Sequence, residues 1–290
     1  MADTDPAGGT ARAWRVIGDD GERRPRINLA RDEALAACNA GEPTVRLWRS
    51  DLSVVLGRAQ VAEAEADMAA CADLGIPVLR RFTGGGAVFH DPGNLNVSVV
   101  VARDDEMVTS RSGHGLAGIY SLVLEPIAAA VRSLAAGTGS AVTADERAIW
   151  IGEGKVSGMA AWLGARTVLV HATLIVDSDL DLLERALAGP GAPGNARWEH
   201  TKSRRVRVTS LAREGLATDP ATVDAAVIAA FNGEAAGAGG TGAVGAAETE
   251  VGAASRRGFT ADEQAAAARL VAERYGHVEW HLEGRSGTAV

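Results

Sequence analysis

Apolar and polar residues alternate along several short runs of the chain, and longer stretches between them have the spacing of amphipathic helices. The alternating runs predict β-strands over residues 44–48, 53–57, 77–81, 87–90, 95–101, 148–151, 156–163 and 167–176. Helical spacing, together with residues typical of helix ends, predicts helices over residues 28–38, 63–74, 114–135, 179–187, 219–231 and 260–275. The strands come in neighbouring groups, so we expect an α+β fold with mixed β-sheets flanked by helices.

Residues at the helix boundaries support these assignments. Asn28 can cap the first helix, and Gly75 follows the end of the second. Thr260, with Glu263 three residues later, predicts a capping box at the start of the last helix. Pro126 lies inside the longest helix, where the missing backbone N–H predicts an interruption or a slight kink.

The ends of the chain and one internal stretch lack the apolar residues of a core. Residues 1–25 and 283–290 are predicted to be disordered tails around one folded domain over residues 26–282. At about residues 232–257, Gly, Ala, Thr and Glu predominate, and such a stretch cannot bury enough apolar surface to offset the entropy of ordering it. We therefore expect a flexible insertion between the last two helices.

The composition limits the classes of function. Against 37 acidic side chains the chain has 29 Lys and Arg, a formal net charge of −8, which argues against nucleic-acid binding. Its two cysteines, Cys38 and Cys71, are too few for a disulfide framework and are typical of a reducing compartment. No run of about 18 apolar residues is present, so no membrane-spanning helix is predicted. The expected location is the cytoplasm.

The segment Arg80–Ser98 has the features of a site for an anionic, nucleotide-like ligand. Arg80 and Arg81 can pair with carboxylate or phosphate groups. The three glycines that follow, Gly84, Gly85 and Gly86, have no Cβ atoms, so their backbone can approach a ligand closely. The alternative interpretation of these glycines is a β-bulge or a tight turn that binds nothing.

A second candidate for chemistry is Lys155, in the stretch Gly152–Gly158. Glycines on both sides predict a turn around the lysine. Its ammonium is a compact charge on a flexible stem, which suits contact with a phosphate or a carboxylate. The alternative is an ordinary exposed lysine in a turn.

Several segments, in the same order along the chain, resemble the lipoate–protein ligase A family. Arg80–Ser98 is similar to the family's signature segment, Lys155–Ala160 to its lysine motif, and His171–Val176 to the strand that follows. Five shorter segments also match: Pro43–Trp48, Val55–Gln60, Lys202–Ser203, Arg207–Thr209 and Tyr275–Trp280. The resemblance implies a biotin/lipoate protein ligase-like catalytic domain, in a short form that lacks the C-terminal accessory domain.

The resemblance implies a two-step, ATP-dependent reaction. Lipoate is first activated to lipoyl-AMP, with ATP and Mg²⁺ as the expected cofactors. The lipoyl group then passes to a lysine of a lipoyl carrier domain, either a 2-oxoacid dehydrogenase E2 subunit or the glycine cleavage H protein. Some short family members need a separate accessory-domain protein, which is therefore a candidate partner.

The resemblance also assigns roles to individual residues. Lys155 is implied as the catalytic residue. Substrate and nucleotide binding are implied for Trp48, Arg80, Arg81, Gly84, Gly85, Gly86, Val88, His90, Asn96, Ser157, Gly158, His171 and Thr173. Three of these have structural alternatives: Trp48 as a core residue, His90 as a hydrogen-bonded histidine at a strand end, and His171 as a structural residue.

One position departs from the family pattern. Family members usually have an Asn-Asp pair before the lysine strand, associated with nucleotide and magnesium binding. Here Arg147 and Ala148 match that pair, and Asp145 or Glu146 could substitute by a small shift. The metal ligands are therefore unknown.

Two other functions compete with the ligase. An octanoyl or lipoyl transferase would work without ATP, but it needs a nucleophilic cysteine near the lysine, and Cys38 and Cys71 lie far upstream. A non-catalytic protein that binds lipoate or the carrier is the third possibility. Loss of the Asn-Asp pair favours that possibility, whereas retention of Lys155 argues against it.

Overall fold

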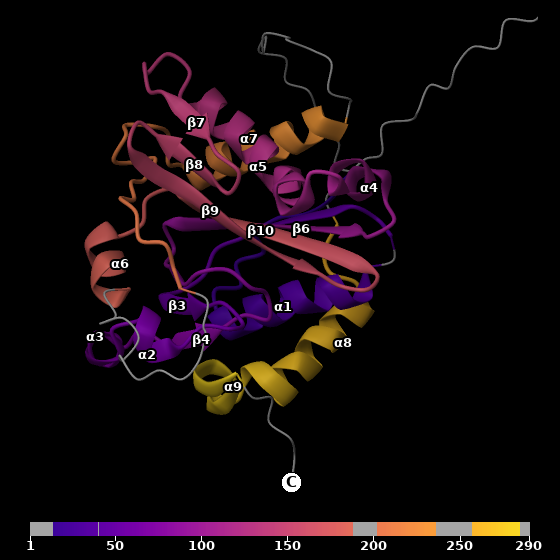
Figure 1. Cartoon of the computed structure of the whole chain (residues 1–290), viewed down its shortest axis with the longest axis vertical. Coiled ribbons are helices and arrows are strands. Elements are labelled where there is room, and N and C mark those ends of the chain that lie inside the picture. The colour runs from indigo at the N-terminus through magenta and orange to yellow at the C-terminus, as the bar shows by residue number, and fades with distance from the viewer. Residues whose placement is uncertain (1–13, 40, 188–201, 236–256, 285–290) are drawn as a thin grey trace, which may run out of the picture.

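The computed structural model describes residues 14–39, 41–187, 202–235 and 257–284 of the chain. Its strands form a seven-stranded sheet in the order β1-β2-β6-β10-β9-β8-β7 and a three-stranded sheet in the order β4-β3-β5. Helices lie on both sides of the larger sheet (Figure 1). Each sheet combines a parallel pair with antiparallel pairs. The predicted α+β fold with mixed sheets flanked by helices is confirmed.

The larger sheet is built on two nine-residue strands, β6 (Asn94–Ala102) and β10 (Thr167–Ile175), which pair antiparallel over their whole length. The register places four residues of neighbouring strands in one row, Trp48, Asn96, Thr173 and Gly158. The other strands are β1 (Arg15–Ile17), β2 (Thr44–Trp48), β7 (Val142–Ala144), β8 (Ala148–Ile151) and β9 (Gly154–Leu163).

The smaller sheet consists of β3 (Ser53–Leu56), β4 (Val78–Arg80) and β5 (Val88–His90). Strand β3 pairs parallel with β4 and antiparallel with β5. The segment with the three glycines is therefore the connection from one edge strand of this sheet to the other. Three short helices carry side chains that pack on this sheet: α2 (Ala62–Glu65), α3 (Met68–Asp73) and α6 (Leu180–Ala186).

One face of the larger sheet is covered by α5 (Gly115–Leu134) and α7 (Pro220–Ala235), which also pack against each other (Figure 1). The largest core cluster lies here, because alternate apolar residues of the strands meet the apolar side of α5. Helix α4 (Glu106–Ser112) leads into α5, which continues through the buried Pro126 without a break in the helix. Within the described residues, α5 is the one helix apolar and long enough to cross a membrane, and more than half of it is buried in this core.

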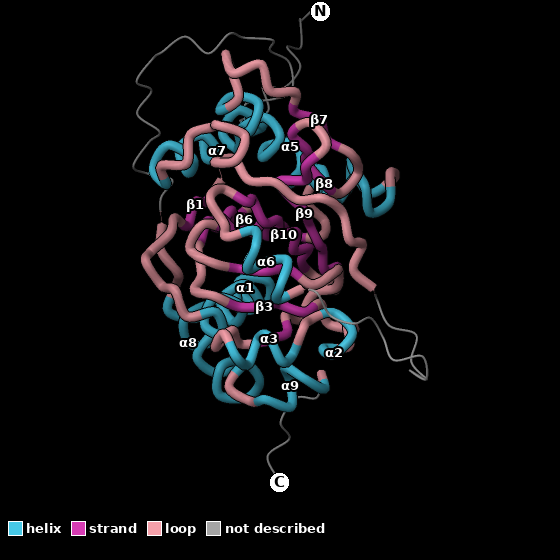
Figure 2. The backbone as a smooth tube through the Cα atoms, turned by 90° about the vertical axis from the view of Figure 1, so that its left-hand side faces the viewer, coloured by secondary structure: helices cyan, strands magenta, loops and turns pink. Residues whose placement is uncertain are grey.

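The opposite face of the larger sheet is covered by α1 (Pro25–Cys38), against which α8 (Ala261–Leu270) packs (Figure 2). Helix α8 begins with the predicted capping box between Thr260 and Glu263 and continues as a π-helical segment, Val271–Tyr275. Helix α9 (Val278–Glu283) then packs against β4 of the smaller sheet.

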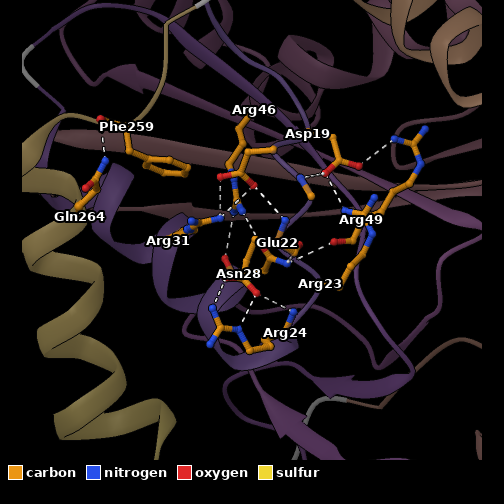
Figure 3. A network of polar contacts seen from close by, with 12 residues as sticks. Asp19, Glu22, Arg23, Arg24, Asn28, Arg31, Arg46, Arg49, Phe259 and Gln264 are labelled. Atoms are coloured by element: carbon orange, nitrogen blue, oxygen red, sulfur yellow. Dashed lines mark hydrogen bonds and ion pairs between the residues drawn. The ribbon is translucent and has the colours of Figure 1, made fainter.

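Polar side chains connect α1 to the larger sheet through a network around Arg46 (Figure 3). The Arg46 guanidinium, fully buried, donates to the Asp32 carboxylate at 2.5 Å and to the side-chain oxygen of Asn28. Asp32 also accepts a hydrogen bond from the Ser98 hydroxyl at 2.7 Å. The hydroxyl oxygen of Ser98 in turn accepts from the indole N–H of Trp48 at 3.2 Å. The buried ion pair of Arg46 and Asp32 is thus linked through Ser98 to Trp48, one of the four residues in the sheet row.

Sequence-based predictions differ from the structure at several further places. Residues 14–25 are not a tail, because Arg15–Ile17 forms β1 with buried side chains and Pro25 opens α1. Asn28 lies inside that helix, where its side chain binds Arg46, so it is not the cap. The helix predicted over residues 63–74 is two helices, because Asp67 caps a new one by accepting from the backbone N–H of Ala70.

The predicted flexible insertion at about residues 232–257 falls mostly outside the described residues, and α7 extends to Ala235 at its start. Residues 1–13 and 285–290 of the two predicted tails also lie outside them.

Candidate functional site

A cavity of about 520 Å³ lies on the face of the larger sheet that α1 covers, next to the smaller sheet. All four residues of the sheet row, Trp48, Asn96, Thr173 and Gly158, line it. Leu29 of α1 and His90 of β5 line it from the other elements. Residues from distant parts of the sequence meet here because β2, β6, β10 and β9 are neighbours in the sheet.

The glycine segment forms one wall of the cavity and is held by Arg81. The Arg81 guanidinium donates to the carbonyl oxygens of Gly84 (2.6 Å), Gly86 (2.7 Å) and Val55 (3.1 Å). Gly85 has a φ of +88°, and a Cβ there would lie 2.8 Å from the Cβ of Ala160. A side chain at position 85 would therefore be strained and would push the segment off β9.

Arg81 is a buried cation. Besides donating to those carbonyl oxygens, its guanidinium donates only to the hydroxyl of Thr83 within the described residues. Burial lowers the pKa of its guanidinium to about 10, so the group stays charged at neutral pH. In the same part of the chain it forms no ion pair with a carboxylate. A buried charge of this kind favours an anionic ligand in the cavity, because neutral acceptors compensate it only in part.

The neighbouring Arg80 is also buried and bound by carbonyl oxygens, but it lies away from the cavity. Its buried guanidinium donates to backbone carbonyl oxygens of two segments, Gly57–Gln60 and Trp280–Leu282. It therefore joins β4 to α9 and does not line the cavity. Arg80 is the last residue of β4 and Arg81 the next along the chain, and successive residues of an extended chain point to opposite sides, which explains why the two arginines differ.

Lys155 lies at the second position of β9, after a turn at Gly152 with a φ of +56°. Its backbone exchanges hydrogen bonds with the carbonyl of Arg207 and the N–H of Thr209, both at 3.0 Å. The side chain lies over Gly158, where an added Cβ would be 2.5 Å from the Nζ atom. The lysine is thus in a strand rather than in the predicted turn. Because Gly158, three residues later, has no Cβ atom, there is room for the ammonium of Lys155.

The ammonium of Lys155 is largely removed from water. Desolvation lowers its pKa, attraction by Asp145 opposes this, and the positive charges of Arg204 and Arg147 lower it further. Within the described residues no carboxylate is close enough for an ion pair with it. Like Arg81, Lys155 is a cation that a bound anion would stabilise.

Two histidines in the cavity are held neutral by burial. Desolvation, followed by the positive charge of Arg81, lowers the pKa of His90 to about 3. The same two causes lower the pKa of His171 well below its usual value. The Nε2 atom of His171 lies 2.8 Å from the hydroxyl of Thr83, whereas Nδ1 of His90 is buried without a hydrogen-bond partner in the described part of the chain. His90 also packs edge-on against Trp48, with ring centroids 5.5 Å apart.

A second cavity, of about 410 Å³, adjoins the first, and Lys155, Gly158 and Thr173 line both. Its apolar lining comes from side chains such as Ile175, Leu183, Leu187, Val206 and Val208.

Two buried polar atoms in this second lining lack hydrogen-bond partners among the described residues, the side-chain oxygen of Asn94 and the hydroxyl of Ser157. Charged residues line this cavity as well: Glu65, Lys155, Glu184, Arg204 and Arg205. A lining that combines apolar faces with unpaired polar atoms and charges suits a flat ligand that carries polar groups at its edge.

Charged residues gather at the part of the first cavity near Lys155: Asp145, Glu146, Arg147, Lys202 and Arg204. The neighbouring Ser203 is fixed to the glycine wall, because its hydroxyl oxygen accepts from the N–H of Ala87 at 2.8 Å.

The two acidic residues, Asp145 and Glu146, are too few to hold a metal ion by protein ligands alone. Each oxygen of the Asp145 carboxylate already accepts a hydrogen bond, from the N–H of Arg147 (2.8 Å) and from the indole of Trp150 (3.0 Å). Ala148 has no donor atom, and Arg147 adds positive charge. No group of three His, Cys, Asp or Glu residues in the described part of the chain could hold a metal.

The structure brings most of the predicted site residues together. The first cavity is lined by Trp48, Arg81, Gly85, Gly86, Val88, His90, Asn96, Lys155, Gly158, His171 and Thr173. Ser157 lines only the second cavity, while Arg80 and Gly84 line neither.

Sequence reasoning missed several lining residues, among them Leu29, Tyr120 and Asn94. Leu29 and Tyr120 look like ordinary apolar positions of helices, so their sequence context carries no signal. Asn94 could have been suspected, because it is a polar residue at the start of an otherwise apolar strand.

The chain resembles known proteins in sequence and in structure. Residues 24–232 match the family model described as lipoyl protein ligase A/B catalytic domain. The chain is 34% identical over 195 residues to lipoate-protein ligase A subunit 1 of Thermoplasma acidophilum, and the match covers 64% of this chain and 71% of that protein.

Solved structures of ligases resemble the whole described fold. One is a putative lipoate protein ligase of T. acidophilum with bound lipoic acid (TM-score 0.70, 27% identity, 93% of this chain and 99% of that one). Another is a lipoate-protein ligase A bound with ATP (TM-score 0.69, 28% identity, 93% and 98%). A bipartite lipoate protein ligase of T. acidophilum, studied with its E2 lipoyl domain, is equally similar (TM-score 0.71, 28% identity, 95% and 98%).

Proposed function

The chain belongs to the family of lipoyl protein ligase A/B catalytic domains, and we therefore propose that it is an ATP-dependent lipoate–protein ligase. In this proposal the carboxylate of lipoate attacks the α-phosphorus of ATP, which forms lipoyl-AMP and releases pyrophosphate. The amine of a carrier lysine then attacks the acyl carbon, which forms an amide and releases AMP and a proton. The observation that carries the proposal is the position of Lys155, where the two cavities meet.

We assign lipoate to the first cavity. Leu29, Trp48, Val55 and Val88 supply apolar surface for the acyl chain, and the neutral His90 adds no charge beside it. The carboxylate of the acid would then lie toward the cations Arg81 and Lys155. An apolar wall with a charge at one end is the arrangement that a fatty-acid-like substrate requires.

We assign the nucleoside part of ATP to the second cavity. The side-chain oxygen of Asn94 is a buried acceptor without a donor among the described residues, and an adenine amino group could supply one. The apolar lining around it suits the faces of the base. Occupation of both cavities would bring the α-phosphate to Lys155, between acid and nucleotide.

Lys155 then has a defined role in the first step. Negative charge grows on the phosphate oxygens as the carboxylate attacks, and a partly desolvated ammonium stabilises this charge more than a hydrated one would. Gly158 leaves the space in which the ammonium can lie. Removing one such group commonly lowers the rate by about 10²–10³-fold.

The partners follow from the same reaction. The second step needs an exposed lysine on a lipoyl carrier domain, for which we propose 2-oxoacid dehydrogenase E2 subunits or the glycine cleavage H protein. A separate accessory protein is a further candidate, and the bipartite ligase of T. acidophilum gives a precedent for it. The magnesium expected from the family has no protein-held site in the donor set around Asp145, so we propose that it arrives bound to the nucleotide.

The octanoyl or lipoyl transferase alternative lacks a nucleophile at the site. Burial raises the thiol pKa of both Cys38 and Cys71, and neither cysteine lines the two cavities. Covalent catalysis by cysteine requires a readily formed thiolate close to the substrate. The transferase is therefore the less favoured function.

The test is lipoate-dependent exchange of pyrophosphate into ATP, measured with the purified chain before any carrier is added. We expect exchange by the wild type and a drop of about 10²–10³-fold for Lys155→Ala, without a fall in melting temperature. Exchange at the wild-type rate in Lys155→Ala would contradict the assigned role.

Absence of exchange in the wild type, both alone and with an added accessory protein, would support the non-catalytic alternative. Such a binder would keep most of its lipoate affinity in Lys155→Ala, which equilibrium dialysis can measure.

A further inference from the structure

The turn between β7 and β8 presents an arginine to the cavity from a rigid backbone. The N–H of Asp145 donates to the carbonyl of Ala148 at 3.0 Å, and the Asp145 carboxylate accepts from the N–H of Arg147 and the indole of Trp150. These three bonds close the turn on itself. The root of the Arg147 side chain is therefore fixed, while the guanidinium is exposed and lines the cavity.

The positive charge of Arg147 is not neutralised by a carboxylate. The side chain forms no ion pair with any residue of the described ranges 14–39, 41–187, 202–235 and 257–284. Asp145 is directed to neutral donors, the peptide N–H and the indole. The two acidic residues in this part of the lining, Asp145 and Glu146, are outnumbered by the cations Arg147, Lys155, Lys202 and Arg204. The guanidinium remains available to a ligand.

The charges around Arg147 form a positive region at the cavity. Lys202 and Arg204 line the same part of it, and both Arg147 and Arg204 act electrostatically on Lys155. A cluster of cations along one wall raises the local concentration of a polyanion and lowers the energy of its bound state. A planar guanidinium is also suited to bidentate contact with phosphate oxygens.

We propose that Arg147 binds the phosphate chain of the nucleotide, at a place where the donor set does not fit a metal ion held by the protein. The inference rests on the proposed use of ATP, and it adds a specific cation to that reaction. It explains why the turn combines a fixed backbone with a positively charged side chain. Nucleotide binding by this chain should then need little help from a divalent cation.

The experiment measures the affinity of ATP by equilibrium dialysis, with excess Mg²⁺ and with EDTA. For the wild type we expect affinities within about threefold of each other under the two conditions. Arg147→Ala should lose about tenfold in affinity for ATP in EDTA. Arg147→Lys should bind with an affinity between those of Arg147→Ala and the wild type, because the charge remains but the bidentate contact is lost. Raising the salt concentration should reduce the difference between wild type and Arg147→Ala.

Two controls separate a phosphate contact from a structural effect. Adenosine lacks phosphates, so Arg147→Ala should bind it as the wild type does; an equal loss for adenosine and ATP would overturn the proposal. Arg132→Ala removes an exposed arginine of α5 that does not line the cavity, and it should leave ATP binding unchanged.

The result is independent of the catalytic assignment. Unchanged ATP affinity in Arg147→Ala, or wild-type binding that disappears in EDTA, would overturn the role of Arg147 even if pyrophosphate exchange is observed. ATP binding that depends on Arg147, without lipoate-dependent exchange either alone or with an added accessory protein, would instead refute the ligase and retain the phosphate contact.

Discussion

Two buried polar clusters in this molecule differ in whether a carboxylate of the protein compensates their positive charge. In the network between α1 and β2, the Arg46 guanidinium is paired directly with the Asp32 carboxylate. In the cavity, Arg81 binds only carbonyl and hydroxyl oxygens, and Lys155 forms no ion pair, as far as the described residues extend. Charged groups are shielded from water in both clusters, but only in the first does a carboxylate of the protein compensate the positive charge.

This difference separates a structural cluster from a functional one. A paired buried charge holds its elements together, and removal of one partner leaves the other uncompensated. An unpaired buried charge weakens the unliganded fold and strengthens the binding of an anion that completes the pair. Substitutions in the first cluster should therefore change stability, and substitutions in the second should change activity.

The largest effect is expected for Asp32→Ala. The substitution leaves Arg46 buried without a carboxylate, and breaking a buried pair in this way costs about 3–5 kcal/mol. Urea denaturation should show this loss in the free energy of unfolding. The residual folded protein should keep lipoate affinity, because Asp32 does not line the cavity.

Two controls accompany this substitution. Asp20→Ala removes a more exposed carboxylate that pairs with Arg31, and it should change the free energy of unfolding by less than about 1 kcal/mol. The double variant Asp32→Ala, Arg46→Ala should be less destabilised than the sum of the two single changes. Strict additivity would show that the pair is not coupled.

A smaller effect, on activity alone, is expected for Gly158→Ala. The new methyl would lie 2.5 Å from the Nζ atom of Lys155, so the tip of that side chain must move. A flexible side chain moves at little cost, so the melting temperature should change only slightly. Pyrophosphate exchange should fall about tenfold, because small displacements of a catalytic group are costly.

The matched control is Gly233→Ala in α7, where an added Cβ meets nothing within 4 Å. It should leave exchange unchanged and slightly stabilise the helix. Full activity in Gly158→Ala would mean that the ammonium does not act from the position described.

The smallest effect concerns pH and His90. The folded protein holds the pKa of His90 at about 3, whereas the unfolded chain titrates near 6.5. Between these values the unfolded state binds a proton that the folded state does not, so stability is lost as the pH falls below 6.5. His90→Gln removes this contribution. The fall in the free energy of unfolding from pH ~7.5 to ~5.5 should therefore be about 1 kcal/mol smaller than in the wild type.

His114→Gln, at an exposed position, serves as the comparison for this measurement. An unchanged pH dependence in His90→Gln would mean that burial does not keep His90 neutral.

Much of the fold follows from local patterns. In β6, β10 and α5, one face packs into the largest core cluster. Apolar residues therefore recur at the period of a strand or a helix, and the element can be predicted from the sequence. The error at residues 14–25 has a tertiary cause: β1 has only three residues, too few for a pattern, and it is stabilised by pairing with β2. The break at Asp67 was missed because a single capping residue inside an apolar stretch competes with a continuous helix.

The site was predictable in part for the same reason. The glycine segment and the pair Lys155 and Gly158 are visible in the local sequence, because a Cβ atom at Gly85 or Gly158 would lie too close to its neighbours. Pairing of the strands then decided which polar residues share the cavity: Asn96, Thr173 and Gly158 are far apart in sequence and adjacent in register. No local pattern carries that information, because register depends on the whole sheet.

Arg80 and Arg81 show where the two kinds of information divide. The sequence alone determined that two basic residues precede three glycines, and hence that positive charge lies near a closely approachable backbone. Only the tertiary structure decided that Arg80 joins β4 to α9 while Arg81 lines the cavity. The physical reason is that each buried guanidinium must find acceptors. Arg81 finds two of its acceptors in the glycine segment that follows it, whereas those of Arg80 belong to two distant segments that only folding brings together.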